Sequence, residues 1–101
     1  MKLLRKVDIE NLRKNSFGEG EPNRKVMVKL FNPYGAGTWW LHSYLDYEED
    51  IVWGWAMINC DTPEYGTISL KELRSLKFLG QPQIERDRSF EPCNFEQIYP
   101  Q

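Results

Sequence analysis

The chain has 101 residues, a length that predicts one domain. Its 41% hydrophobic and 14% aromatic residues suffice for a modest core, and its net charge of −2 argues against general nucleic-acid binding. No apolar run approaches the roughly 20 residues of a membrane-spanning helix, and no signal-peptide pattern follows the first residues, so we expect a cytoplasmic protein without a membrane partner. Within the single domain (1–101) we expect an N-terminal helix and loop (1–23), a core (24–90) and a C-terminal tail (91–101).

Charge is distributed unevenly along the chain. Residues 1–29 carry a net charge of +4, residues 30–66 carry six acidic side chains and no Lys or Arg, and residues 67–101 are balanced. The basic start and the acidic middle can complement each other within the fold, or the acidic middle can form a surface that meets a basic protein groove. We favour the first, because sequence segments need not coincide with surface patches.

The first third of the chain predicts a helix, a loop, a strand and a turn. Asp8 can cap a short helix that continues to Asn15, since a carboxylate suits the positive end of a helix. The Gly- and Pro-containing stretch 16–23 predicts a loop. Apolar and polar residues alternate from Arg24 to Phe31, which predicts a half-buried strand. The turn residues at 32–37 include two glycines, but no Lys-Ser/Thr pair follows them, which argues against a phosphate-binding loop.

The stretch from Thr38 to Ile58 contains all four tryptophans and predicts a hairpin closed by Tyr47, Glu48, Glu49 and Asp50. With that loop, Asp46 faces Ile51, and one face is bulky and aromatic: Trp40, His42, Tyr44 and Asp46 opposite Met57, Trp55, Trp53 and Ile51. The other face carries Trp39, Leu41, Ser43 and Leu45 opposite Ile58, Ala56, Gly54 and Val52. A helix can lie against the small residues, and the aromatic face then needs another cover or a partner.

The last third predicts a helix, an edge strand and a tail. Ser69 and Glu72 form a capping-box pattern, leucines follow at helical spacing, and Gly80 and Pro82 then end the helix near Leu79. Alternation from Gln83 to Phe90 predicts an edge strand or extended arm, and residues 91–101 predict a tail over apolar surface. We therefore expect an α+β fold: a small antiparallel sheet of three to five strands, the 69–79 helix packed on one face, and the short N-terminal helix at an edge.

Several short motifs resemble, in their order along the chain, the bacterial family of domain of unknown function 2958. They are Lys29-Leu30-Phe31-Asn32-Pro33, Gly37-Thr38-Trp39, Trp53-Gly54-Trp55-Ala56, Glu64-Tyr65-Gly66, Ser69-Leu70-Lys71-Glu72-Leu73 and Ile84-Glu85-Arg86-Asp87. Members of that family occur on plasmids, conjugative elements and phages, and a small relative is similar to an anti-CRISPR protein that acts on the type II effector nuclease. The resemblance implies no established chemistry.

Catalysis and metal binding have little support in the sequence. His42 with Cys60 and Cys93 lacks the close ligand pairs of zinc sites, and no nucleophile elbow accompanies either cysteine. Both cysteines are expected to be free thiols in a reducing cytoplasm. We therefore expect no enzyme, no metal and no cofactor.

Two groups of residues are candidates for binding. Glu85, Arg86 and Asp87 can guard an exposed edge strand, include a buried Arg86 tied to an acid such as Glu64, or form a recognition patch, and the first two alternatives together outweigh the third. For the aromatic face we rank core first, protein interface second and base stacking third. The acidic loop opposes base stacking, although two strand lysines, Lys25 and Lys29, could partly offset it.

Together with the resemblance, these patterns predict a non-enzymatic inhibitor from a phage or mobile element that binds the host type II CRISPR effector nuclease or another basic protein. The alternative is a nucleic-acid-binding accessory of a conjugative element. The predicted partner-binding residues are Trp40, Tyr44, Tyr47, Glu48, Glu49, Asp50, Trp55, Glu85, Arg86 and Asp87.

Overall fold

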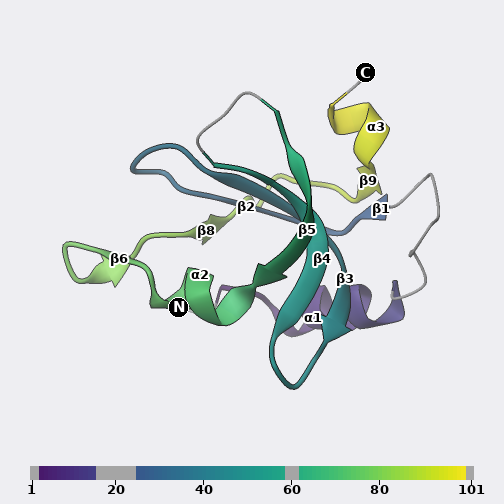
Figure 1. Cartoon of the computed structure of the whole chain (residues 1–101), viewed down its shortest axis with the longest axis horizontal. Coiled ribbons are helices and arrows are strands. Elements are labelled where there is room, and N and C mark those ends of the chain that lie inside the picture. The colour runs from purple at the N-terminus through teal and green to yellow at the C-terminus, as the bar shows by residue number, and fades with distance from the viewer. Residues whose placement is uncertain (1–2, 16–24, 59–61, 100–101) are drawn as a thin grey trace.

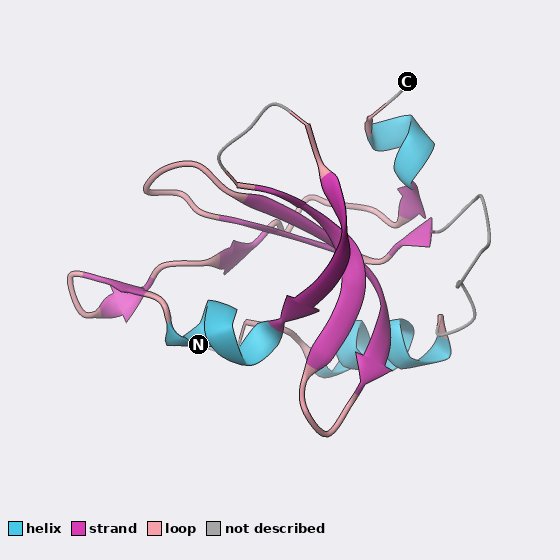
Figure 2. Cartoon of the chain, viewed as in Figure 1, coloured by secondary structure: helices cyan, strands magenta, loops and turns pink. Residues whose placement is uncertain are grey.

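The computed structural model describes residues 3–15, 25–58 and 62–99 and shows a five-stranded antiparallel sheet with three short helices (Figures 1 and 2). The predicted α+β class is confirmed. The strands in spatial order are β5 (Glu64–Ser69), β4 (Ile51–Met57), β3 (Thr38–Asp46), β2 (Val28–Phe31) and β8 (Glu85–Arg86). Two small two-stranded ladders join β1 (Lys25–Val26) to β9 (Cys93–Asn94) and β6 (Lys77–Phe78) to β7 (Gln81–Pro82). The helices are α1 (Lys6–Lys14), α2 (Leu70–Ser75) and α3 (Phe95–Ile98).

The hairpin β3–β4 has the predicted turn but not the predicted register. Asp46 faces Ile51, which confirms the turn at 47–50. Beyond the turn the register shifts twice, once between Tyr44 and Asp46 and once between Leu41 and Ser43. Each shift is a β-bulge that puts two residues of β3 opposite one of β4. The other expected pairs are therefore wrong, and the observed ones include Trp40 with Trp55, Ser43 with Trp53, and Tyr44 with Val52.

The bulges decide which side chains enter the main core. Tyr44, expected on the aromatic face, packs in the same cluster as Leu41 because the extra residue between them changes the alternation. Leu12 of α1, Leu70 and Leu73 of α2, and Ile84 before β8 belong to this cluster too. The main core thus contains side chains of the sheet together with side chains from both longer helices.

A second, smaller cluster lies around Trp40. Trp40, Val26 and Phe95 are its buried members, and Trp55 packs against them. Phe95 comes from α3, and Figure 1 shows α3 at the end of the molecule away from α1. The C-terminal segment therefore supplies the cover that the aromatic face requires.

The N-terminal helix begins earlier than the sequence predicts. α1 starts at Lys6, so the expected N-cap role of Asp8 is wrong. Asp8 lies in the first turn instead, where its carboxylate accepts the backbone N–H of Arg5 at 2.9 Å. This satisfies one of the backbone donors that a helix start leaves without a partner.

The second helix has the predicted cap but is shorter than predicted. The Ser69 hydroxyl accepts the Glu72 N–H at 3.3 Å, which confirms the N-cap. The helix ends at Ser75, and the chain turns back between β6 and β7 through Leu79 (φ 53°) and Gly80 (φ 81°). The expectation of a helix reaching Leu79 is therefore wrong: a local hairpin replaces its last turn.

Two other predicted strands, 24–31 and 83–90, are interrupted or short. The stretch expected from Arg24 divides into β1 and β2 around Met27, whose N–H donates to the Leu41 carbonyl at 2.8 Å. Of the stretch 83–90, only Glu85 and Arg86 pair with β2, at the edge of the sheet.

One ion pair, between Asp8 and Arg86, ties α1 to the edge strand β8, and a second, between Asp8 and Arg5, lies within the start of the helix. The Asp8 carboxylate, only 4% exposed, accepts the Arg5 side chain at 2.8 and 3.0 Å and lies 3.5 Å from Nε of Arg86. Burial acts to raise the pKa of Asp8, but hydrogen bonds from Arg5 and the charges of Arg5 and Arg86 outweigh it and lower the pKa below its usual range. Arg86 is thus tied to an acid, but the acid is Asp8 rather than Glu64.

We expect Gly54→Ala to destabilise the fold by roughly 1–3 kcal/mol, because a Cβ there would overlap the Trp40 carbonyl oxygen and lie 3.1 Å from Cα of Leu41. The measurement is the midpoint of thermal or urea unfolding. Gly66→Ala is the matched control: Gly66 pairs directly with Gly54, and a Cβ there meets no atom within 4 Å. Equal midpoints for the two variants would contradict the close approach.

We expect Asp8→Asn to cost about 2 kcal/mol at pH 7, because Arg5 and Arg86 then lose their counter-charge. Since the folded-state pKa of Asp8 is lowered, its stabilisation is complete above the unfolded-state value of about 3.9 and is lost as pH falls through the folded-state pKa. The difference between wild type and variant should therefore shrink below about pH 4. Glu85→Gln, at an exposed carboxylate, is the control; a pH-independent deficit in Asp8→Asn would exclude the charge effect.

Candidate functional site

The most exposed cluster of predicted site residues is the hairpin tip, defined here as residues 45–50. Figure 2 shows the turn between β3 and β4 projecting below the rest of the chain. Leu45 is 52% exposed and Tyr47 is 49% exposed. Asp46, Glu48 and Glu49 are also exposed. Two large apolar side chains thus stand among three carboxylates at the outermost point of the hairpin.

Tyr47 is held in place by its neighbours. The Arg13 guanidinium lies 4.2 Å from the centre of the Tyr47 ring, and the Tyr44 ring meets it edge-on at 5.2 Å. Burial raises the pKa of the Tyr44 phenol, although the Arg74 charge opposes that effect. Tyr44 is thus a buried support for the tip rather than part of its surface.

Asp50 differs from the other acids of the tip because it is structural. Its carboxylate forms an ion pair with Arg74 and accepts the Tyr44 hydroxyl at 3.4 Å. Its carbonyl accepts the N–H of Leu70, the first residue of α2, at 2.9 Å. Glu49 lies 3.8 Å from Lys71, but both side chains are mostly exposed, and such pairs contribute little.

Complementary charges pair differently from our expectation. Among the described residues, no ion pair joins the basic segment 1–29 to the acidic segment 30–66. Asp50 and Glu49 pair with α2, whereas Lys29 pairs with Asp87 at 3.5 Å. The expected pairing of the first two segments is thus not seen among residues 3–15, 25–58 and 62–99. Arg13 of the basic segment instead places its guanidinium over the ring of Tyr47 in the acidic segment.

Trp40 and Trp55, two predicted binding residues, are covered by the C-terminal segment. Trp40 is 5% exposed and meets Phe95 edge-on at 5.6 Å. Trp55 stacks on Phe95 with ring centres 4.0 Å apart and planes 1° from parallel. The interpretation ranked first, that the aromatic face packs inside the protein, therefore applies to Trp40 and Trp55. Farther along the sheet, Trp53 stacks on Tyr65 at 5.6 Å, and Tyr65 is partly exposed.

His42 lies in a buried polar network. The Ser43 hydroxyl is 2.8 Å from Nδ1 of His42, and the Tyr65 hydroxyl is 2.6 Å from Nε2. Asn15, at the end of α1, donates to the His42 carbonyl at 2.7 Å. A serine beside a histidine can act as a nucleophile, but Ser43 is 1% exposed and a substrate must reach its oxygen. These hydrogen bonds orient the side chains of His42, Ser43 and Tyr65 beside the β-bulge between Leu41 and Ser43.

The predicted triplet Glu85, Arg86 and Asp87 does not form one surface. Arg86 is held by Asp8, and Asp87 is held by Lys29 and by the N–H of Ser89, which donates to its carboxylate at 2.9 Å. Glu85 alone is exposed. The charged residues at this edge are therefore mostly structural.

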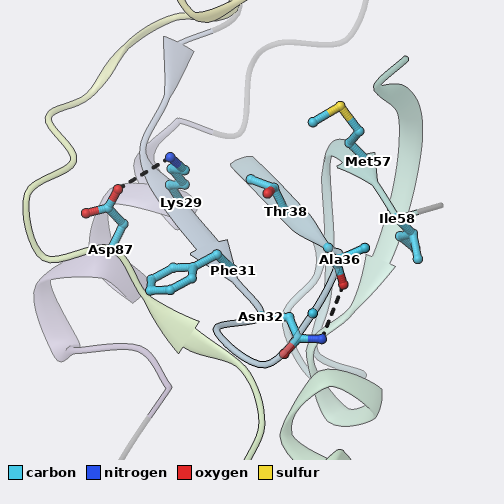
Figure 3. A pocket seen from close by; sticks show the side chains of 10 residues that line it. Lys29, Phe31, Asn32, Ala36, Thr38, Met57, Ile58 and Asp87 are labelled. Carbon is cyan, nitrogen blue, oxygen red and sulfur yellow. Dashed lines mark hydrogen bonds and ion pairs between the residues drawn. The ribbon is translucent and has the colours of Figure 1, made fainter. Parts of the chain in front are cut away.

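A shallow pocket of about 560 Å³ lies beside the turn at 32–37 (Figure 3). The Lys29–Asp87 pair stands on one side of it, and Met57 and Ile58 stand on the other. The Asn32 side chain donates to the Ala36 carbonyl at 3.2 Å and accepts the Tyr34 N–H at 2.9 Å. Because Lys29 is already paired and Asn32 braces the turn, this pocket offers no free cation to a phosphate.

Sequence reasoning missed two residues of the tip, Leu45 and Asp46, both of which are exposed. Leu45 was expected on the inner face opposite Val52, whereas Tyr44 takes that position and Leu45 points to solvent. A bulge leaves no signal in the alternation itself. The acids Asp46 to Asp50 beside Leu45 were the available hint that the residue lies outside the core.

Cysteine and metal sites add little to the candidate surface. Cys93 is a half-buried free thiol, and Cys60 lies outside the described residues. Within 3–15, 25–58 and 62–99, no group of three or more His, Cys, Asp or Glu side chains is placed to hold a metal ion. In the same residues, no helix has the length and apolar character needed to cross a membrane.

Comparison with known proteins gives a family but no characterised relative. No curated protein matches the chain, and no solved structure matches it. One family model, described as a protein of unknown function (DUF2958), matches residues 3–99. Since this match covers nearly the whole chain, the protein belongs to the DUF2958 family.

Proposed function

We propose that the protein is a non-enzymatic inhibitor, carried by a phage or other mobile genetic element, that binds a basic protein in the cytoplasm of a bacterial host. The proposed target is the type II CRISPR effector nuclease. The observation that carries the proposal is the hairpin tip, where exposed Leu45 and Tyr47 are surrounded by Asp46, Glu48 and Glu49.

The composition of the tip suits a protein partner. Tyrosine is among the residues that contribute most to protein interfaces, and a polar rim around an apolar centre is the usual arrangement of such interfaces. Tyr47 is already held by Arg13 and Tyr44, so binding would cost less side-chain entropy than it would for a free tyrosine.

The charge of the tip suits a basic groove. Effector nucleases of the CRISPR type hold their guide–target duplex in a positively charged channel. Carboxylates presented on a projecting turn can occupy such a channel in place of phosphates. Exposed carboxylates also steer association with a basic surface.

The geometry gives less support to the nucleic-acid-binding alternative. Trp40 is buried and meets Phe95 edge-on, and Trp55 is stacked on Phe95, so a base would reach these rings only after movement of the C-terminal segment. Lys29 is paired with Asp87, and the exposed acids of the tip would repel phosphates.

The first test is charge reversal at the tip with Glu48→Lys/Glu49→Lys. Asp50 is left unchanged because it anchors α2. We expect the association rate with the type II effector nuclease, measured by surface plasmon resonance, to fall at least about tenfold. Inhibition of DNA cleavage should weaken in parallel, and the salt dependence of association should decrease.

The matched control is Glu91→Lys/Glu96→Lys, which makes the same change in net charge at two exposed acids near α3. It should retain the wild-type rate. Equal losses in both variants would show a general charge effect, and tight single-stranded DNA binding by the wild type would favour the alternative function.

A second test addresses the non-enzymatic assignment. Tyr65→Phe removes the hydroxyl that meets His42 but keeps the ring that stacks on Trp53. We expect inhibition to remain within about twofold of wild type, because the network is assigned no proton transfer. Loss of activity in a Tyr65→Phe protein with an unchanged unfolding midpoint would contradict the assignment.

A further inference from the structure

A second concave pocket, of about 660 Å³, lies between the N-terminal end of α1, the end of α2 and the segment around β7 and β8. Its volume falls within the range of roughly 300–1,000 Å³ that is usual for small-molecule sites. Leu4, Leu73 and Ile84 line it and are buried members of the main core. The pocket therefore has an apolar floor that continues into the core.

The wall of this pocket is cationic, although the chain as a whole has a net charge of −2. Four basic side chains line it, Arg74, Lys77, Arg86 and Arg88, against one acid, Glu85. Lys77 and Arg88 are exposed and form no ion pair within the described residues. These two charges are thus available to an anion in the pocket.

Arg86 adds positive charge that one carboxylate does not cancel. Its Nε is buried, lies 3.5 Å from the Asp8 carboxylate and has no hydrogen-bond partner. That carboxylate already accepts three hydrogen bonds from Arg5. One negative charge therefore serves two guanidinium groups, and the cluster behind the pocket wall keeps an excess of one positive charge.

We propose that this pocket binds a small organic anion with an apolar body, of the class of medium-chain carboxylates. The hydrocarbon part lies on the floor formed by Leu4, Leu73 and Ile84, and the carboxylate is bound by Lys77 and Arg88. Apolar floor and charged wall recognise different parts of one molecule, which is how small-molecule sites gain both affinity and orientation. The inference is independent of the proposed inhibition, because none of these residues belongs to the hairpin tip.

Isothermal titration calorimetry of the full chain with decanoate tests the proposal. We expect saturable binding of one molecule per chain, at least tenfold tighter than the binding of decanol. The affinity should fall as salt is added, since exposed cations at Lys77 and Arg88 are screened over about 8 Å at physiological ionic strength. Absence of saturable binding, or equal affinities for decanoate and decanol, would overturn the proposal.

Charge reversal with Lys77→Glu/Arg88→Glu should lower decanoate affinity at least tenfold. Lys14→Glu/Lys25→Glu, which makes the same change in net charge outside the pocket, should stay within twofold of wild type. Equal losses in both variants would overturn the proposal.

If the reversal variant unfolds, Lys77→Gln/Arg88→Gln replaces it with the same expected direction. Amide chemical shifts of the wild type then locate the ligand: decanoate should move the amide signals of Leu73 and Ile84. Shifts confined to the hairpin tip or to the C-terminal segment would place the ligand elsewhere and overturn the proposal.

Discussion

The close approach of β3 to β4 at Gly54 is the constraint on which the rest of the structure depends. Gly54 lies opposite Leu41, where a side chain would overlap the backbone of β3, and the first bulge follows directly. In a regular strand Leu41 and Tyr44 would point to opposite faces, yet both enter the main core. Leu45, the residue after Tyr44, then points away from this core and is exposed. One strand thus supplies the main core, the aromatic cluster and the hairpin tip.

Two carboxylates hold the helices to this sheet. Asp8 joins the start of α1 to Arg86 at the edge of the sheet, and Asp50 joins the hairpin to the first residue and the last turn of α2. Although burial acts to raise the pKa of Asp8, hydrogen bonds from Arg5 and the charges of Arg5 and Arg86 stabilise its anion and lower that pKa. The acidic segment of the sequence therefore has two roles. Asp50 stabilises the fold through its contacts with Arg74 and Tyr44, whereas Glu48 is exposed at the surface.

Features set by near neighbours could be predicted from the sequence. The turn at 47–50 follows from the polar residues between two apolar runs. The Ser69 cap follows from a hydrogen bond between Ser69 and Glu72, which are only three positions apart. The end of α2 could not be predicted, because the leucine spacing continues to Leu76. There Gln83, at the far end of the β6–β7 hairpin, donates its N–H to the Leu76 carbonyl at 3.1 Å and the chain leaves the helix. The exposed position of Leu45 depends likewise on a bulge that only pairing with β4 reveals.

Arg74 lies at the boundary between the acidic tip and the cationic pocket and adds no unpaired charge to either. Arg74 lines the pocket, but its charge is neutralised by Asp50 at the base of the tip. The charge of the pocket then rests on Lys77 and Arg88, and that of the tip rests on Glu48 and Glu49. Effects of substitutions at sites without shared partners are usually additive. Because the two surfaces share none of these four residues, loss of binding at one surface gives no reason to expect loss at the other.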